Sequence, residues 1–472
     1  MVTLVNRAKV STATTGTGTI TLGTAESGYQ TFADAGVVDT DVVRYVIEDG
    51  TDWEIGTGTY TATGTTLSRT VLESSNADAA LNLTGSAVVY VSATAEDIPP
   101  VLELYAENPS SPTAPSATGA NAVAIGTNSG ASGIESVSIG GNSNVSGDYS
   151  IALGNSNDVT ASFAGAIGLA ADATGNYAFA LGAASFASGL QSVAIGRDTD
   201  ATSSGALAIG YQAQAKTGSN ATAISRSYAS GTDSFAAAIT NNTSSYGATG
   251  SSSVAIGRFA RASAQDGIAI GDTALASGIN GHAFGNAAIA SGSKSVVIGG
   301  DGNVASGGGS VAIGGYYAVS AINSKVVFGG GYIGTNPTVN AYQAGLLSLG
   351  VNTVDATPTV LRSDNLAASA TNQIILPNNS AYAFHGTIVA RQQASAGTAC
   401  AAWKIEGLIR REGSAGTTVL VNSATTVLDN TPAWGMALSA DTTNGGLKIE
   451  VTGAAATNIR WVATINTSEV TY

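Results

Sequence analysis

The feature that most constrains the fold is a repeat of about 14 residues that runs from Ala122 to Gly329. Its best-preserved copies read Ser-Val-Ala-Ile-Gly and occupy residues 192–196, 253–257 and 310–314. The large apolar residue before the glycine recurs at steps of 14, 15 or 17 residues, at Ile125, Ile139, Leu153, Ile167, Leu181, Ile195, Ile209, Ile224, Ile239, Ile256, Ile270, Phe284, Ile298, Ile313 and Phe328. A fixed short period of this kind predicts a solenoid, here of about 15 stacked coils.

One copy of the repeat cannot be stable by itself. On a strand, Val193 and Ile195 share one face while Ala194 points to the other. Burying two large side chains contributes roughly 4 kcal/mol, whereas fixing the backbone costs about 1–2 kcal/mol for each residue of the coil. We therefore expect neighbouring coils to bury one another's large side chains. The glycine after each core allows a tight bend, and small-residue half-repeats such as 275–278 allow another backbone to come close.

This pattern resembles the head repeat of trimeric autotransporter adhesins of the YadA type, because period, core and half-repeat all match. The resemblance implies a left-handed parallel β-roll and three chains assembled side by side as a homotrimer. Some copies depart from the pattern, since Thr222 and His282 replace the first large residue. We expect His282 to be a packed residue, with binding of an anion or metal on a trimer axis as the alternative. The uneven step between Ile239 and Ile256 predicts a loop that bulges around residues 241–250.

Composition narrows the function class. The 472-residue chain is long enough for two to four domains, and its net charge of −14 argues against binding to nucleic acid, which requires a basic surface. A hydrophobic content of 44% with only 11% charged residues excludes ordinary disorder. Cys400 is the single cysteine, so neither an intramolecular disulfide nor a cysteine metal site is expected. The first residues do not read as a secretion signal, and no apolar run is long enough to span a bilayer.

Residues 1–98 read as an N-terminal β-domain. Residues 42–48 and 53–55 predict two strands joined at the Asp49-Gly50 hairpin turn. The stretch 46–54 resembles the N-terminal domain of many tailed-phage tail-fibre and virion proteins, which implies attachment to the particle. Asp49 and Asp52 could be calcium ligands, but we expect a solvated turn.

The sequence predicts three further segments after the N-terminal domain. Residues 99–118 are a proline-rich linker, and no proline occurs from Ser116 to Asn336, as expected where strands donate ladder hydrogen bonds. The head β-roll is expected over 119–330, and residues 331–371 are expected to be a neck that caps it.

Residues 372–472 predict a C-terminal β-sandwich of jelly-roll type, with short strands and a hairpin at Asn444-Gly445-Gly446. This segment looks like the terminal domains of phage and marine viral fibres, which implies receptor binding. Aromatic side chains are the candidates for contact with a glycan, and the alternative is that they form the sandwich core. The candidates are Tyr382, His385, Trp403, Trp434 and Trp461.

No catalytic motif stands out. The only histidines are His282 and His385, so the chain has almost no residues from which a histidine metal site or a catalytic triad could be formed. A polysaccharide hydrolase would need paired carboxylates at a defined separation, which sequence alone cannot place. No enzyme activity, metal or cofactor is therefore expected.

Together these patterns predict an all-β, homotrimeric tail-fibre or tail-tip protein of a phage, located in the virion tail. Residues 1–98 would bind tail or baseplate proteins, and residues 372–472 would bind a host surface glycan or outer-membrane receptor. One alternative is a bacterial trimeric adhesin fragment, which the missing signal and anchor disfavour. The other is a capsule-depolymerising tailspike.

Overall fold

The computed structural model describes residues 2–98, 113–240, 244–331, 333, 341–393, 398–430 and 432–472. Two compact units are present, residues 1–106 and residues 107–472. The described residues are all-β apart from two short 3-10 turns, η1 (Ala95–Asp97) and η2 (Ala415–Thr417). The predicted all-β fold class is thus confirmed. Most of the predicted proline-rich linker, residues 99–112, lies outside the described residues.

The N-terminal unit contains a seven-stranded sheet in the order β1-β9-β4-β5-β6-β3, with β7 also paired to β5. Its strands are β1 (Lys9–Thr12), β3 (Ile20–Thr21), β4 (Val42–Asp49), β5 (Asp52–Thr61), β6 (Thr66–Leu67), β7 (Thr70–Ser74) and β9 (Ala87–Val91), and a separate pair is formed by β2 (Thr15–Gly16) and β8 (Leu83–Thr84). The predicted hairpin is present, because β4 and β5 pair antiparallel from Val42↔Thr59 to Asp49↔Asp52. Tyr45 and Ile47 of β4 lie in its buried core.

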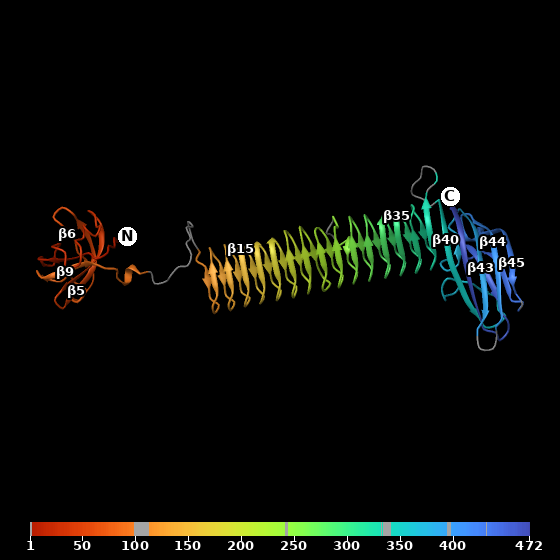
Figure 1. The fold of residues 1–472 in the computed structure, drawn as a ribbon, viewed down its shortest axis with the longest axis horizontal. Coiled ribbons are helices and arrows are strands. Elements are labelled where there is room, and N and C mark those ends of the chain that lie inside the picture. The colour runs from red at the N-terminus through yellow and green to blue at the C-terminus, as the bar shows by residue number, and fades with distance from the viewer. Residues whose placement is uncertain are drawn as a thin grey trace. The chain divides into compact units, whose positions relative to one another are not determined.

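The solenoid consists of coils that each contribute one strand to two parallel sheets (Figure 1). The first sheet contains β11 (Val123–Ile125), β13 (Val137–Ile139), β15 (Ile151–Asn155), β17 (Gly165–Leu169), β19 (Phe179–Ala183), β21 (Val193–Ile195), β23 (Leu207–Ile209), β25 (Thr222–Ile224), β27 (Phe235–Ala237), β29 (Val254–Ile256), β31 (Ile268–Ile270), β33 (His282–Asn286), β35 (Val296–Asp301), β37 (Val311–Ile313) and β39 (Val326–Gly331). The second, 15-stranded sheet contains β10 (Ser116–Ala117), β12 (Gly130–Ala131), β14 (Asn144–Val145), β16 (Asp158–Val159), β18 (Asp172–Ala173), β20 (Phe186–Ala187), β22 (Asp200–Ala201), β24 (Gln214–Ala215), β26 (Tyr228–Ala229), β28 (Gly247–Ala248), β30 (Arg261–Ala262), β32 (Leu275–Ala276), β34 (Ile289–Ala290), β36 (Val304–Ala305) and β38 (Val319–Ser320). The predicted solenoid of about 15 coils is confirmed.

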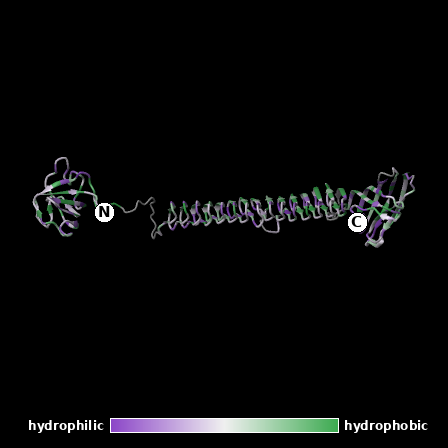
Figure 2. Ribbon diagram, turned by 90° about the horizontal axis from the view of Figure 1, so that it is seen from below, coloured by the Kyte–Doolittle hydropathy of each residue, from purple (hydrophilic) through white to green (hydrophobic). Residues whose placement is uncertain are grey.

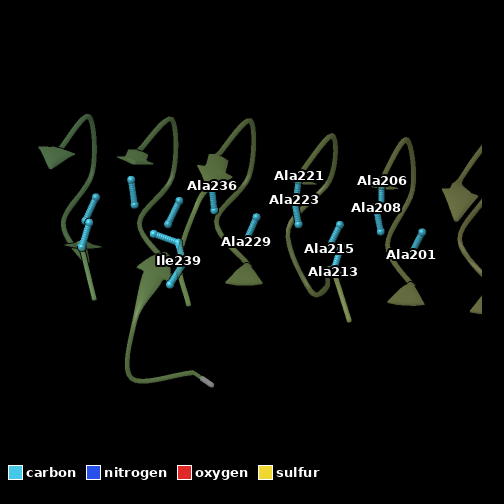
Figure 3. Packing of buried hydrophobic residues seen from close by; sticks show 14 of the residues in the cluster. Ala201, Ala206, Ala208, Ala213, Ala215, Ala221, Ala223, Ala229, Ala236 and Ile239 are labelled. Atoms are coloured by element: carbon cyan, nitrogen blue, oxygen red, sulfur yellow. The ribbon is translucent and has the colours of Figure 1, made fainter. Parts of the chain in front are cut away.

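The interior of the solenoid is lined mainly by alanine. The side of each strand that faces inward is therefore opposite to the one expected from the sequence. Ala194, the central residue of β21, is fully buried, whereas the flanking Val193 and Ile195 are half-buried on the outer face. Ala201 of β22 is also fully buried, and the alanines of the two sheets form one continuous cluster (Figure 3). Because the two strands of each coil lie so close, only small side chains fit between them. The expectation that stacked coils bury the valine and isoleucine side chains was therefore wrong.

The large residues instead form an outward-facing column, which we call the outer stripe. It consists of the first and third residues of the strands in the first solenoid sheet, and the parallel register places each of these side chains beside its equivalent in the next coil, as in Val193↔Leu207 and Ile195↔Ile209. These side chains are half-buried or exposed throughout, and Ile298 is 48% exposed. Figure 2 shows hydrophobic strands recurring from coil to coil.

The glycine after each core has a packing role as well as a conformational one. Gly196 has a φ of +136°, and a Cβ added there would lie 2.4 Å from the carbonyl oxygen of Gly210 in the next coil. No side chain fits that space, so the residue must be glycine for the coils to stack at this separation. The same relationship joins Gly182 to Gly196.

The irregular coil contains a shift that the sequence pattern did not reveal. Ala237, rather than Ile239, pairs with Ile224 on one side and Ile256 on the other. Ile239 lies two residues further on and is fully buried inside the coil (Figure 3). The inclusion of Ile239 in the regular series of large residues was therefore wrong, because the insertion breaks the spacing of the repeat. Residues 241–243 of the predicted bulge lie outside the described residues.

One exposed edge of the solenoid carries a ladder of stacked aromatic rings. Tyr149, Phe163 and Tyr177 occupy equivalent positions in consecutive coils, and their ring centroids are 5.1 Å apart in both pairs. The rings are close to parallel, at 8° and 6°. Each residue has a positive φ, near +57°, in a turn where the side chain points outward.

The last coil is capped by β40 (Tyr342–Thr353), a strand that lies inside the predicted neck. Its first residues pair antiparallel with β39, as in Val326↔Leu346, and its whole length pairs with β48. The segment expected to be a separate neck therefore supplies a strand of the C-terminal sheet. This strand satisfies the edge hydrogen bonds that an open end of the solenoid would leave free.

The C-terminal part is a β-sandwich, as predicted. The larger layer has the order β40-β48-β43-β44-β45, formed by β40, β48 (Ile459–Thr471), β43 (Ser380–Gln392), β44 (Cys400–Arg411) and β45 (Val419–Asp429). The smaller layer centres on β47 (Gly446–Thr452), which pairs with β41 (Thr359–Val360), β42 (Ile374–Ile375) and β46 (Gly435–Asp441). Alternate residues of β48 such as Trp461 and Ile465 point into the core between the layers.

Candidate binding surface

The predicted tryptophan candidates form the centre of the sandwich core. Trp461 is fully buried and lies 5.7 Å, between ring centroids, from both Trp403 and Trp434. Its indole Nε1 donates a hydrogen bond of 2.9 Å to Thr353 Oγ1. The exposed fractions of Trp403 and Trp434 are 3% and 5%, so a glycan in solution has no access to these ring faces. Their burial is the arrangement expected under the alternative of a packed core.

Tyr382 is buried as well, beside an ionic cluster where the last coil meets the sandwich. Lys325 precedes β39 and contacts Glu469 of β48, and its Nζ lies 5.3 Å from the centre of the Tyr382 ring. Glu469 also accepts a 2.7 Å hydrogen bond from Gln343 Nε2. Burial lowers the pKa of the Lys325 amine, although the carboxylate opposes this change. Burial and Glu469 together raise the pKa of the Tyr382 hydroxyl. This cluster is structural, because its members are turned inward.

His385 alone among the aromatic candidates is exposed. It lies on the outer face of the larger layer, directly between Asn466 of β48 and Glu406 of β44. The next outward row contains Thr387, between Thr464 and Lys404. These side chains line a shallow groove of about 320 Å³. The groove offers hydrogen-bond donors and acceptors with one charge of each sign, a composition suited to polyhydroxylated ligands.

A second, larger hollow lies on the same outer face at the β40 edge. Its volume is about 460 Å³, and its polar lining includes Ser348, Asn352, Arg362 and Arg460. An adjoining hollow of about 310 Å³ shares Arg460 and adds Arg391. These arginines are not among the residues that the sequence patterns singled out. The alternation of β43 and β48 could have placed Arg391 and Arg460 outward, but only the register shows that they are directly opposite.

The N-terminal acids proposed as possible calcium ligands have protein partners. Asp49 accepts hydrogen bonds from the backbone N–H and the hydroxyl of Thr84, at 2.6 and 2.7 Å. These bonds lower the pKa of Asp49 and fix its carboxylate within the turn region. Asp52 accepts a weaker 3.4 Å bond from Ser75 Oγ. The geometry agrees with the hairpin alternative.

His282 lies on β33 within the outer stripe, between Ile268 and Val296 of the adjacent coils. Its ring meets Phe284 edge to face, at 6.3 Å between centroids. Within the part of the chain that the structure describes, no three His, Cys, Asp or Glu side chains gather in a way that could hold a metal ion. The same residues include no helix long and apolar enough to cross a membrane.

Comparison with known proteins identifies the solenoid. The model of the YadA head domain repeat matches residues 116–129, 131–157, 166–199, 201–224, 248–274 and 276–301. The unmatched interval 225–247 contains the irregular coil in which Ile239 turns inward. No curated protein matches the chain.

The solved structures that match the chain include two phage tailspike proteins. The tailspike protein gp49 from Acinetobacter baumannii bacteriophage Fri1, a capsular polysaccharide depolymerase, is 9% identical, with 74% of this chain and 69% of that chain covered at a TM-score of 0.18. The tailspike protein of Acinetobacter phage vB_ApiP_P1 is 9% identical, with coverage of 67% and 80% and a TM-score of 0.12. Scores this low do not establish a shared fold. The family match and the coil geometry agree, and the matched segments of the solenoid carry the YadA head domain repeat.

Proposed function

We propose that the protein is a homotrimeric adhesive fibre of a phage tail, in which the solenoid is a stiff spacer and the C-terminal sandwich meets the host surface. The observation that carries this proposal is the outer stripe. Valine, isoleucine and leucine side chains are presented at the same position in coil after coil, and each remains half-buried or exposed in a single chain. Contiguous apolar surface of this extent is typical of an interface.

The occupant of the outer stripe is proposed to be two further copies of the same chain. A closed ring of identical subunits brings the same surface of every copy toward one axis. The YadA head repeats support three copies, because the adhesins that the repeat resembles are trimers. In this arrangement the alanine interior stabilises each coil, whereas the outer stripe stabilises the assembly.

The end domains are assigned by resemblance and by position. Residues 1–98 are proposed to bind tail or baseplate proteins, because 46–54 resembles the corresponding stretch of phage virion proteins. The proposed receptor-binding region is the sandwich, predicted from the sequence to span residues 372–472, and β40 extends it toward the solenoid. Three sandwiches on one fibre would bind repeated surface glycans at high effective concentration. The proposed role is binding rather than catalysis.

The solution mass of the full chain tests the assembly. One chain is 46.4 kDa, so light scattering after size exclusion should give three times that value, or 139.2 kDa. A monomer at micromolar concentration would contradict the fibre proposal. Attachment is tested by flow cytometry of the labelled chain on a panel of bacterial strains, and absence of binding to every strain would count against it. Release of reducing ends from the bound polysaccharide would contradict the non-catalytic role.

A further inference from the structure

We propose that the C-terminal sandwich binds an anionic saccharide in an arginine groove, formed by Arg362, Arg391 and Arg460 on the outer face of its larger layer. The inference rests on the proposed function and specifies the chemical class of its ligand. Arg391 of β43 and Arg460 of β48 are direct cross-strand partners, and both side chains are exposed. Arg362 belongs to the segment after β41 and is held at the β40 edge by a 2.7 Å bond from Gly350 N–H to its carbonyl oxygen.

Within the part of the chain that the structure describes, none of the three guanidinium groups forms an ion pair with a carboxylate. Among the described residues, the ion pairs of the C-terminal part join other groups, namely Lys325–Glu469, Arg410–Glu412 and Lys448–Glu450. Like charges directly opposite on neighbouring strands are destabilising. The chain carries only 18 Lys and Arg residues against 32 Asp and Glu, so such a cluster is not a by-product of composition.

The existing contacts of the arginines leave donors free for a ligand. Arg460 Nε donates a long 3.4 Å bond to Asn352 Oδ1, and Arg391 Nη1 donates a 2.7 Å bond to the Thr398 carbonyl oxygen. Arg362 Nε is buried and has no hydrogen-bond partner in the structure. A buried donor without a partner costs free energy. This donor is closed to solvent, so the groups open to a ligand are the exposed guanidinium groups of Arg391 and Arg460.

One acidic residue does line the larger hollow, but its oxygens are already used. Asp364 accepts hydrogen bonds from Asn323 Nδ2 at 2.9 Å, Asn372 Nδ2 at 2.8 Å and Leu366 N–H at 2.9 Å. Burial opposes ionisation of this carboxyl group, yet these bonds, together with the charge of Arg362, lower its pKa. The three bonds orient the carboxylate toward the protein. Asp364 therefore shapes the hollow, and the exposed guanidinium groups remain the charged feature open to a ligand.

The chemistry of the lining selects the ligand class. A guanidinium presents a planar fork of N–H donors that fits a carboxylate or phosphate group with two parallel hydrogen bonds. Ser348, Asn352 and Asn365 beside it can exchange hydrogen bonds with sugar hydroxyls. The combined hollows exceed the size of a single ion. A sugar that carries a carboxylate or phosphate satisfies both parts of the lining.

The position of the arginine groove keeps it clear of the outer stripe. β39 pairs with β40 only as far as Leu346, whereas Arg460 pairs with Asn352. Six residues along a strand correspond to about 20 Å. The arginine groove therefore lies at the ends of the strands remote from the last coil, about 20 Å along β40 from its pairing with the outer stripe.

The test uses the full chain and isothermal titration with oligogalacturonate, a uronic acid polymer, and with a neutral galactan oligosaccharide of equal length. We expect the wild type to bind the first and not the second. The double variant Arg391→Gln/Arg460→Gln should lose at least about 10-fold in affinity, since each lost charged hydrogen bond has an effect of this order. The matched control is Arg410→Gln, another exposed arginine of the same layer, which should bind like the wild type. Equal binding by the double variant, or equal binding of the neutral sugar, would overturn the inference.

Two further arms identify the bound group and separate this inference from the attachment proposal. Competition by inorganic phosphate would support recognition of the anionic group, whereas phosphate binding without any oligogalacturonate binding would overturn the saccharide assignment. If the wild type and the double variant attach to bacteria equally well, the proposal of an arginine groove is wrong and the attachment proposal stands. If oligogalacturonate binds through the arginines while no strain is bound, the groove stands and attachment is wrong.

Discussion

The Nζ atom of Lys325 lies 2.5 Å from Oε1 of Glu469, and this buried ion pair joins the last solenoid coil to the C-terminal sheet. Both side chains are at most 4% exposed. Glu469 accepts further hydrogen bonds from Thr467 and Gln343, and Gln343 also bonds the backbone of Val319 in β38. The junction is therefore held by a network whose members come from both sides.

Glu469→Gln should weaken this junction strongly, because it leaves the Lys325 ammonium buried without a counter-charge. We expect a loss of about 3–5 kcal/mol in the free energy of unfolding. Hydrogen exchange of peptides from β39 and β40 should rise more than that of β13. The control is Glu412→Gln, which removes an exposed partner of Arg410 and should have little effect. Unchanged exchange at the junction would contradict the structural role of the pair.

Adjacent positions of one strand should respond in opposite ways to the same substitution. Ala255 is fully buried inside the coil, whereas Ile256 is half-buried in the outer stripe. Ala255→Asp places a charge in the narrow interior, so we expect loss of soluble folded protein. Ile256→Asp should leave the coil folded and reduce association between chains. Circular dichroism and solution mass measure the two effects, and a normal trimer formed by Ile256→Asp would argue against the outer stripe as the interface.

The N-terminal unit depends on a buried carboxylate. Glu54 is fully buried and accepts hydrogen bonds from Tyr45 Oη at 2.7 Å, from Leu81 N–H at 2.8 Å and from Arg69. Glu54→Ala would leave the buried Arg69 unpaired, and we expect a cost of about 3–5 kcal/mol. Calorimetry should show this loss in the unfolding transition of the N-terminal unit. The control Glu48→Ala changes an exposed residue and should lower the free energy of unfolding far less. Equal losses for the two variants would show that burial of the pair does not matter.

A pH-dependent contribution is expected from Asp97. The Arg44 guanidinium, bound through hydrogen bonds of 3.0 and 2.9 Å, lowers the pKa of Asp97 to about 2 from 3.8. A carboxyl group with a lowered folded-state pKa stabilises the fold above its unfolded-state value, and this stabilisation is lost as the pH falls from 3.8 through 2. Asp97→Asn should therefore lower the melting temperature of the N-terminal unit at pH 7. The difference in melting temperature between the variant and the wild type should become smaller near pH 2. A difference that does not change with pH would contradict the contribution of Asp97 to stability.

The amino-acid sequence by itself determined the repeat and much of the end domains. The period of 14 residues and its 15 copies predicted the coils, because each coil must present the same edge to the next. The Asp49-Gly50 turn and the Asn444-Gly445-Gly446 turn predicted hairpins that the structure contains. These features are local, so the order of residues is enough to specify them.

Tertiary structure decided which side of each strand faces inward. The alternation Val-Ala-Ile is compatible with either face being buried, and hydrophobicity alone favoured the larger residues. The close approach of the two sheets favours small side chains, alanine in most coils as at Ala194 and Ala201 and valine in a few as at Val297, and this separation is a property of the whole coil. Ile239, by contrast, is a large side chain inside its coil, because the insertion after it changes the spacing of the repeat.

Contacts between distant segments were likewise beyond the sequence. Lys325 and Glu469 are brought together because β40 pairs with both β39 and β48. The same register places Arg460 opposite Arg391, and it turns Trp461 inward where the sequence allowed a surface role. Strand order and register are set by the sum of many pairings across the sheet, so no single stretch of the chain encodes them.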